Sequence, residues 1–301
     1  MTRYSVIGDW GTSRLRLFRI EGGHVVDRRE GPGIAALPAA PEVVLRQALA
    51  GWRGDGVPEA IRLCGMVGSR NGWIEVPYAD CPADARTWRA GAGSILLDDI
   101  AVTILPGLAC SDAAGVPDVM RGEETQIFGA VALDAALGRG RHVIILPGTH
   151  SKWVVVEDGR VLTFRTFLTG ELFALLSDHS TLTRAGNGRG NDTDEAHGFA
   201  HGLARADDAI LLGGLFEARS AQLRADRSPA WARGFLSGLI IGREIGEGLD
   251  LFAPRGMVSV IGDPILVGRY NQAMARRGIV AIPLDGDRCA LAGLTLSEQD
   301  S

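Results

Sequence analysis

Three apolar segments of this sequence each end in a glycine-containing turn that carries polar side chains. The first turn reads DWGTS and contains Asp9, Gly11, Thr12 and Ser13. Glycine lets backbone N–H groups approach phosphate oxygens, hydroxyls add donors, and a carboxylate holds a metal ion directly or through water. The turn therefore fits a phosphate-binding loop with Asp9 as the metal ligand, although Asp-x-Gly-Thr is also common in plain hairpin turns.

The second turn reads PGTHSK and follows the apolar residues 143–146. Its Gly148, Thr149 and Lys152 supply backbone N–H groups, a hydroxyl and one cation, so the first two turns together predict a clamp on a polyphosphate. Gly262 stands in the third turn, before a predicted helix. Such a turn accepts a nucleoside or a phosphate, although any strand-to-helix connection needs one. The chain has no G-x-x-x-x-G-K-[ST] motif, which excludes a P-loop.

Two adjacent carboxylates, Glu123 and Glu124, lie at the start of a predicted helix over residues 122–137. Acidic residues in a first helical turn ordinarily interact with the helix dipole. Because this pair precedes the second turn, one of the two could instead deprotonate a hydroxyl, or orient a water, for attack on a γ-phosphoryl group. Glu124 is slightly favoured because it lies one position deeper in the helix.

A loop after the apolar residues 60–64 reads MVGSRNGW and is rich in small and amide side chains that can hydrogen-bond a polyol. Gly68, Ser69 and Trp73 of this loop are therefore candidates for substrate binding. Two arginines elsewhere in the chain are candidates for a substrate carboxylate, because a guanidinium meets a carboxylate with two parallel hydrogen bonds. These are Arg121 and Arg165, and each by itself is more often a surface or structural arginine.

The elements that must position these residues occur twice. The periodicity predicts two sets of three strands, residues 4–8, 14–20 and 24–29, then residues 143–146, 152–156 and 160–165. A single offset of 137 residues carries Gly11-Thr12 onto Gly148-Thr149 and the turn at Glu21-Gly22 onto Asp158-Gly159, without gaps. Such self-similarity favours an internal duplication.

Helices alternate with short apolar strands in the rest of the chain, which predicts an α/β fold of mixed sheets with covering helices. Two related domains are expected, residues 1–138 and residues 139–301, facing each other across a cleft. The further predicted helices are residues 42–52, 170–177, 195–204, 209–224, 229–248, 265–276 and 287–296. The further predicted strands are residues 60–64, 102–105, 257–261 and 279–283, with an irregular stretch after the first of them.

Composition excludes several classes of partner. The chain has 301 residues and a net charge of −5, and it lacks the basic stripe that nucleic-acid binding needs. No stretch approaches the length of a membrane span. The four cysteines are scattered, which favours reduced thiols in the cytoplasm. The 41 glycines indicate tight turns and close backbone approaches.

His197 and His201 have the spacing of a helical zinc pair. No further ligand cluster accompanies them, and Gly198 and Gly202 weaken the predicted helix. A zinc site is therefore not expected there.

Six blocks of the sequence together resemble one known family. They are DWGTS at 9–13, GMVGS at 65–69, VMRGEETQ at 119–126, PGTHSKW at 147–153, FRT with TGEL over 164–172, and FLSGLIIG at 235–242. In this order they resemble the 2-dehydro-3-deoxygalactonokinase family of the actin-like, sugar-kinase superfamily. The resemblance covers the chain from end to end, and MRGEETQ and PGTH-x-KW are its most distinctive blocks. It implies two ribonuclease-H-like (actin-like ATPase) domains.

The resemblance also implies an activity and a set of ligands. The reaction would be phosphoryl transfer from MgATP to the 6-hydroxyl of 2-dehydro-3-deoxy-D-galactonate, a step of galactonate degradation. Asp9 would hold Mg2+, and the first two turns would bind the phosphates from opposite walls. Related exopolyphosphatases carry their catalytic glutamate at the position of Glu123 or Glu124. Leu146 and Pro147 stand where many superfamily members carry a second metal-associated aspartate, which implies metal binding through a single carboxylate.

Two readings from other classes stay open. An exopolyphosphatase-like hydrolase would use the same glutamate to activate water, but it would favour a basic groove in place of this acidic chain. A non-catalytic sugar-sensing regulator usually adds a helix-turn-helix segment, whereas this chain begins directly at its first strand with Tyr4. For the kinase, the expected partners are the sugar acid and ATP, and a homo-oligomer is compatible with the sequence. Galacto and gluco epimers both remain candidate substrates.

Overall fold

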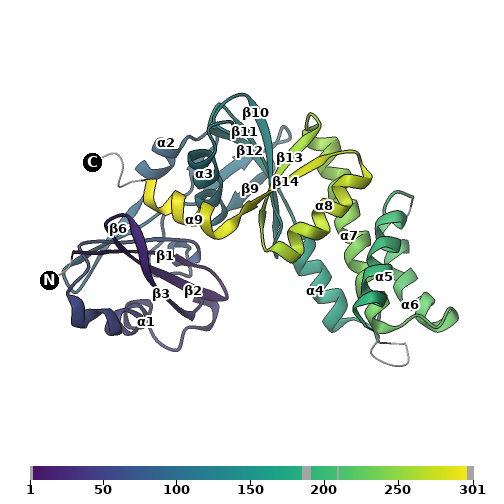
Figure 1. Ribbon diagram of the computed structural model, residues 1–301, viewed down its shortest axis with the longest axis horizontal. Helices are drawn as coiled ribbons and strands as arrows, with labels where there is room; N and C mark the ends of the chain where they lie inside the picture. Colours follow the sequence, from purple (N-terminus) through teal and green to yellow (C-terminus); the bar gives the residue numbers. More distant parts are fainter. Residues whose placement is uncertain (1–2, 185–190, 209, 297–301) are drawn as a thin grey trace. The chain divides into compact units, whose positions relative to one another are not determined.

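The structure is a computed structural model that describes residues 3–184, 191–208 and 210–296 (Figure 1). Contacts between Cα atoms divide the chain into two compact units. The first comprises Met1–Arg141, Val155–Phe164 and Asp285–Ser301, and the second comprises His142–Val154 and Arg165–Leu284. The domain boundary expected at residue 138 and the cleft between the domains stay predictions.

Six strands form one sheet of the first unit, in the order β3-β2-β1-β4-β7-β6. They are β1 (Ser5–Trp10), β2 (Arg14–Glu21), β3 (His24–Pro32), β4 (Ile61–Cys64), β6 (Gly93–Leu97) and β7 (Ile100–Ile104). β1 pairs with β2 in an antiparallel hairpin, whereas β4 runs parallel to β1 and β7 parallel to β4. The residues that follow β1 and β4 therefore emerge at one edge of this sheet.

The second sheet repeats this order of neighbours as β12-β11-β10-β13-β14. Its strands are β10 (Arg141–Leu146), β11 (Ser151–Glu157), β12 (Arg160–Phe167), β13 (Met257–Gly262) and β14 (Val280–Asp285). β10 and β13 are parallel, as β1 and β4 are in the first sheet. The shared order agrees with the duplication that the sequence predicts.

The gapless offset within that duplication is wrong by one residue. The hairpin turns lie at Gly22-Gly23 and at Asp158-Gly159, and all four residues have positive φ. These turns are related by 136 residues, whereas the strands before them begin 137 residues apart, at Arg14 and Ser151. The cause is that β2 has 8 residues and β11 has 7.

The stretch that the sequence leaves irregular contains regular structure. A small sheet has the order β5-β8-β9, with β5 (Ala79–Asp80), β8 (Leu108–Ser111) and β9 (Pro117–Met120). α2 (Ala85–Ala90) and β6 lie between β5 and β8 in the chain. Segments this short carry little periodicity of their own, and β5 pairs with β8, which comes much later in the chain.

Every predicted helix occurs, with ends that differ by a few residues. The helices are α1 (Pro41–Leu49), α3 (Glu123–Leu133), α4 (Thr169–His179), α5 (Asp192–Arg205), α6 (Leu211–Arg224), α7 (Pro229–Phe252), α8 (Pro264–Arg276) and α9 (Gly286–Thr295). Residue 209, where one predicted helix begins, lies outside the described residues. Among the helices that are described, none combines the length and apolar character that a membrane crossing requires.

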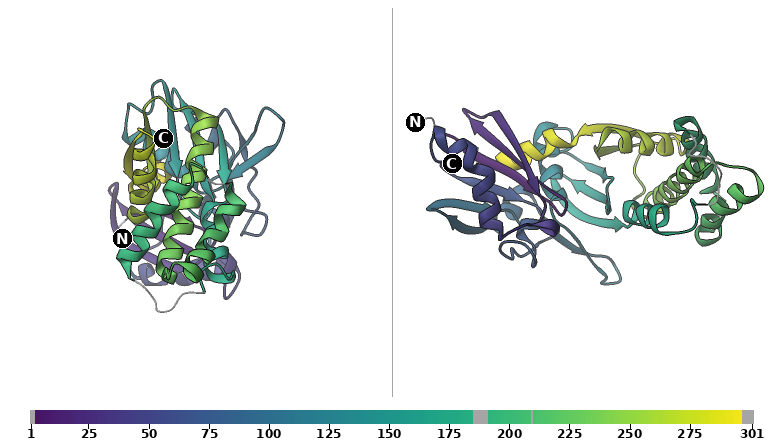
Figure 2. Two further views of the ribbon diagram at one scale, coloured as in Figure 1. Left: turned by 90° about the vertical axis from the view of Figure 1, so that its right-hand side faces the viewer. Right: turned by 90° about the horizontal axis from the view of Figure 1, so that it is seen from below.

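Glycines bring α5 and α7 into backbone contact in the second unit, where α5, α6 and α7 lie side by side (Figure 2). A Cβ atom on Gly198 or Gly202 would lie 2.0 or 2.1 Å from a carbonyl oxygen of α7. In return, a Cβ atom on Gly234 or Gly238 would lie 2.0 or 2.1 Å from a carbonyl oxygen of α5. The glycines expected to weaken α5 are thus the residues that let it pack, and this packing outweighs their low helix propensity.

We expect Gly238→Ala to destabilise the protein, because its methyl group would lie 2.1 Å from the Phe199 carbonyl oxygen. Separating the helices should cost about 1–3 kcal/mol of unfolding free energy. Gly246→Ala in the same helix is the matched control, since its nearest atom is the flexible end of Arg277 at 3.6 Å. That variant should be stabilised by about 0.5–1 kcal/mol. Urea unfolding measures both, and equal stability of the two variants would contradict the close-packing role.

Candidate active site

Asp9 lies at the end of β1, where the parallel neighbour β4 also ends. The register pairs Asp9 with Cys64, and Gly65 follows directly. Gly65 has φ of 93°, and a Cβ atom there would lie 2.8 Å from the Trp10 carbonyl oxygen and 3.0 Å from Asp9 Oδ1. The position therefore requires glycine, and it brings the backbone of the following loop against the Asp9 carboxylate.

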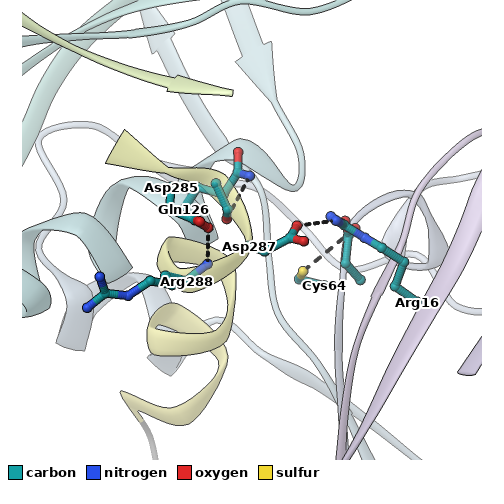
Figure 3. A network of polar contacts seen from close by, with 8 residues as sticks. Arg16, Cys64, Gln126, Asp285, Asp287 and Arg288 are labelled. Carbon is teal, nitrogen blue, oxygen red and sulfur yellow. Dashed lines mark hydrogen bonds and ion pairs between the residues drawn. The ribbon is translucent and has the colours of Figure 1, made fainter. Parts of the chain in front are cut away.

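The Asp9 carboxylate forms an ion pair with Arg16 of β2, at 2.7 Å between Oδ2 and the guanidinium. The same guanidinium contacts Asp287 of α9 at 2.5 Å, and Figure 3 shows these two side chains pointing toward each other. Asp285 caps α9 by accepting from the Arg288 N–H at 2.9 Å, which holds the first turn of that helix in place. The sequence did not identify Arg16 or Asp287, because neither belongs to a turn motif.

One carboxylate at a strand end suits a magnesium ion that is shared with a nucleotide. Mg2+ is usually bound by one or two carboxylates together with phosphate oxygens and water. In the part of the chain that the structure describes, no group of three or more His, Cys, Asp or Glu side chains gathers to hold a metal alone. Asp9 thus fits the single-carboxylate arrangement, in competition with its ion pair to Arg16.

The tip of the β1–β2 hairpin presents Thr12 and Ser13 as exposed residues. Two backbone hydrogen bonds of 3.0 Å hold it from outside, from the Ile34 N–H to the Gly11 oxygen and from the Ala35 N–H to the Thr12 oxygen. The tip therefore has a defined conformation while its hydroxyls face solvent.

Glu124 is fully buried in the first turn of α3. Its two carboxylate oxygens both accept from the Gly122 N–H at 2.8 Å. Burial, and secondly the charge of Glu123, raise the pKa of Glu124 to about 8. Glu123 is half-buried, and its carboxylate accepts from the Arg121 N–H at 3.2 Å. A raised pKa makes the Glu124 carboxylate a stronger base than an ordinary glutamate.

The start of α3 is adjacent to the end of β4. Gly122, with φ of 114°, would place a Cβ atom 3.6 Å from the Gly65 Cα atom, and Gly65 lies against Asp9. Backbone contact with α9 holds α3 in this position, because Cβ atoms on Gly129 and Gly293 would lie within 2 Å of carbonyl oxygens of the opposite helix. The first unit therefore brings the Asp9 turn and Glu124 together around Gly65.

Arg121 and the Ser69 loop also lie together in the first unit. The Arg121 guanidinium donates to the Val76 carbonyl oxygen at 2.7 Å and stacks 4.2 Å above the Tyr78 ring. A Cβ atom on Gly68 would lie 3.0 Å from its NH1 atom. Among the described residues, the buried Arg121 Nε and NH1 atoms and the buried Ser69 hydroxyl have no hydrogen-bond partner. Unmet donors of this kind are what an oxygen-rich anion would satisfy.

Trp73 belongs to the same loop as Ser69, and its backbone N–H donates to the Val67 carbonyl oxygen at 2.8 Å. Its ring is partly buried against the core of the first unit. Trp73 therefore connects the loop to the sheet behind it.

In the second unit, the start of α4 supports the Gly148-Thr149 turn. A Cβ atom on Gly170 would lie 2.3 Å from the Gly148 carbonyl oxygen. The Glu171 N–H donates to the Thr149 carbonyl oxygen at 2.9 Å, and the Glu171 carboxylate contacts His150 Nε2 at 2.5 Å. On its other side Gly148 is open, since a Cβ atom there would meet no described atom within 4 Å. The turn is thus held from behind and accessible in front.

The remaining predicted site residues of the second unit differ in their surroundings. Gly262 ends β13, and a Cβ atom there would lie 3.5 Å from the Pro147 carbonyl oxygen, beside the second turn. Lys152 is buried in β11, and its amine donates to the His150 carbonyl oxygen at 3.4 Å. Arg165 is half-buried on β12. Gly262 therefore joins the second turn, while the roles of Lys152 and Arg165 stay predictions.

Comparison with known proteins identifies relatives along almost the whole chain. A family model described as 2-keto-3-deoxy-galactonokinase matches residues 9–296. The Rhizobium meliloti (strain 1021) protein named "Probable 2-dehydro-3-deoxygalactonokinase DgoK1" is 38% identical over 97% of this chain and 95% of its own length. The 2-dehydro-3-deoxygalactonokinase of Escherichia coli (strain K12) is 33% identical over 98% of this chain and 97% of its own length.

Solved structures confirm the fold class that the resemblance implied. A Sinorhizobium meliloti crystal structure described with the same enzyme name superposes with a TM-score of 0.89, at 35% identity and 98% coverage of both chains. Acetate kinase from Entamoeba histolytica superposes with a TM-score of 0.53 at 6% identity, covering 98% of this chain and 99% of its own, which shows a shared fold alone. The fold is that of the actin-like sugar kinases, and the chain belongs to the 2-keto-3-deoxy-galactonokinase family.

Proposed function

We propose that this protein transfers the γ-phosphoryl group of ATP to the 6-hydroxyl of 2-dehydro-3-deoxy-D-galactonate. The relatives that bear the name of this activity match the chain over nearly its full length. The observation that carries the proposal is Glu124, a buried carboxylate of raised pKa beside the Asp9 turn. A base of this kind is what a kinase needs for a sugar hydroxyl, whose own pKa is high.

Each unit supplies its own part of the machinery. In the first unit, Gly11, Thr12 and Ser13 bind phosphate oxygens. In the second unit, Gly148 and Thr149 bind further phosphate oxygens, Lys152 contributes positive charge, and Gly262 belongs to the nucleoside site. These donor types and turns suit a nucleoside triphosphate, because glycine turns direct backbone N–H groups at phosphate.

Asp9 is the residue that would hold Mg2+, by releasing Arg16. The ion, when bound, would neutralise charge on the phosphates that it contacts. Arg16 retains Asp287 as its second carboxylate partner, so its guanidinium would stay neutralised after Asp9 changes partner. Asp287 would therefore keep the Arg16 charge paired while Asp9 holds the ion.

The proton of the acceptor hydroxyl passes to Glu124. As that hydroxyl oxygen forms its bond to the γ-phosphorus, the bond from the γ-phosphorus to the β–γ bridging oxygen breaks and ADP leaves. Glu123 maintains the basicity of Glu124 through its charge. The Gly122 N–H holds the carboxylate in place during this transfer.

Arg121 and Ser69 bind the carboxylate of the sugar acid. Their unmet donors support this role, and the stack of Arg121 on Tyr78 keeps the planar guanidinium oriented for two parallel hydrogen bonds. Gly68 leaves room beside the guanidinium, and Trp73 holds the loop in place. Arg165 is a further candidate for the same carboxylate.

A coupled assay of ADP release with MgATP tests the proposal. The acceptors are 2-dehydro-3-deoxygalactonate, its gluconate epimer, galactonate, glucose, and none. We expect turnover with the dehydro-deoxy acids only, because glucose lacks the carboxylate that Arg121 and Ser69 would meet, and galactonate carries hydroxyls in place of the 2-keto and 3-deoxy positions. ADP release without any acceptor would instead indicate a phosphohydrolase, and no release by the folded protein would leave the sugar-sensing regulator.

The pH dependence of kcat/KM distinguishes the two glutamates. Because the base must be deprotonated, kcat/KM should rise through the pKa of Glu124, about 8, and level off above it. Glu123→Gln removes a charge that raises this pKa, so the rise should move to lower pH with activity retained. Glu124→Gln should lower kcat about 10²–10⁴-fold. If Glu123→Gln abolishes turnover while Glu124→Gln does not, Glu123 is the base.

Arg121→Lys keeps the positive charge and removes the planar fork. We expect kcat/KM for the sugar acid to fall about 10- to 100-fold, the cost of a lost charge-assisted hydrogen bond, with KM for ATP unchanged. Arg70→Ala is the matched control, because Arg70 directly follows Ser69 in the loop that lies beside Arg121, with a side chain 86% exposed and a distant ion pair to Glu75 at 3.9 Å. Equal effects of the two variants would refute the assignment of Arg121.

A further inference from the structure

A buried carboxylate lies behind the second glycine turn and has no part in the chemistry described above. Glu244 of α7 is 3% exposed. Its Oε1 atom accepts from the Ser151 hydroxyl at 2.7 Å and from the Trp153 indole N–H at 2.8 Å. Its Oε2 atom accepts from the Tyr270 hydroxyl at 2.5 Å, and Thr169 is a fourth side-chain partner. All of these residues belong to the second unit.

The donors to Glu244 come from the elements that form and support the Gly148-Thr149 turn. Ser151 is the first residue of β11 and lies two positions after Thr149. Thr169 begins α4 and is followed by Gly170 and Glu171, the residues in contact with the turn. Glu244 therefore accepts hydrogen bonds from both elements next to the turn, β11 through Ser151 and α4 through Thr169.

The third element that donates to Glu244 is α8, which follows the turn at Gly262. Tyr270 belongs to α8, whose first turn is capped by Asp263, and Gly262 before it lies beside Pro147. The Tyr270 hydroxyl also contacts the Ser151 hydroxyl at 3.3 Å. The Glu244 side chain thus joins the start of β11, the start of α4 and helix α8, which follows Gly262.

The chemistry of this cluster favours a single arrangement. A buried carboxylate is stable only with donors on both oxygens, and buried hydroxyl and indole groups need acceptors in turn. Removing the carboxylate leaves several buried donors without a partner at once, and β11 and α4 then lose their common attachment. This loss would first affect the Gly148-Thr149 turn, which directly precedes β11 and is in contact with the start of α4.

We propose that Glu244 is a positioning residue for the Gly148-Thr149 turn, holding the start of β11 and the start of α4 so that the turn's N–H groups meet the phosphates of ATP. The inference rests on the proposed function. Being buried, Glu244 acts through Ser151, Thr169 and Tyr270 and touches no substrate.

The test compares Glu244→Ala and Glu244→Gln with the wild-type enzyme in steady-state kinetics. We expect KM for ATP to rise about tenfold or more in the alanine variant and less in the glutamine variant, which keeps one acceptor oxygen. KM for the sugar acid should stay within about twofold, since its candidate contacts Arg121 and Ser69 belong to the first unit. The glutamine variant also serves if the alanine variant does not fold.

Gln222→Leu provides the matched control. Gln222 of α6 is buried in the same unit and donates to the Leu182 and Ala218 carbonyl oxygens at 2.5 and 2.7 Å. Its loss also leaves buried polar groups unpaired, but none of these partners belongs to the second turn or its support. We expect KM for ATP to be unchanged in this variant even where its melting temperature falls.

Amide hydrogen exchange of the full chain without ligands provides a readout that is independent of turnover. Exchange should rise in peptides covering residues 148–153 and 169–172 of the Glu244 variants, and not in those of Gln222→Leu. Wild-type KM for ATP in folded Glu244 variants would overturn the proposal, and so would equal effects of Gln222→Leu. If the wild type phosphorylates no acceptor, the proposed function fails, and the exchange pattern alone then supports or overturns the positioning role.

Discussion

Backbone contact between helices at glycine residues is the constraint on which both units depend. Gly129 and Gly293 bring α3 against α9, and the glycines of α5 and α7 do the same in the second unit. At such separations no side chain fits between the helices, so each crossing determines both the rotation and the axial position of a helix. The residues at the starts of α3 and α9, and Glu244 along α7, are therefore placed by packing and not by local preference.

Buried carboxylates in this protein differ in how many donors surround them, and their proposed roles follow from that difference. Glu124 is fully buried, lies beside the charge of Glu123 and receives hydrogen bonds from backbone N–H groups, so burial and then that charge raise its pKa to about 8, and it can exchange a proton. Glu244 is equally buried but has four side-chain partners, which oppose the effect of burial on its pKa and make it a rigid attachment point. Asp9 is paired with a guanidinium that has a second carboxylate available. The surroundings of a carboxylate side chain thus determine which role suits it: base for Glu124, positioning residue for Glu244 and metal ligand for Asp9.

Much of the fold follows from local signals in the sequence. The strands around each glycine turn and the eight predicted helices occur because their apolar periodicity and turn residues extend over enough positions to be decisive. The small sheet β5-β8-β9 gave no such signal, since its strands are short and β5 pairs with β8, which comes much later in the chain. The glycines of α5 were misjudged for a related reason: their effect depends on α7, about 35 residues later in the chain.

The sequence by itself determined the glycine turns that follow β1 and β10, the order of most elements, the family and the types of residue available for phosphate and acid binding. These are properties of short segments, and polypeptide geometry limits what such segments can do. Only the tertiary structure decided that Arg16 pairs with both Asp9 and Asp287, that Glu124 is fully buried while Glu123 is half-buried, and that Glu244 lies behind the second turn. Those outcomes depend on which helix face meets which strand end. Helix crossings set that placement through contacts between residues that are far apart in the sequence.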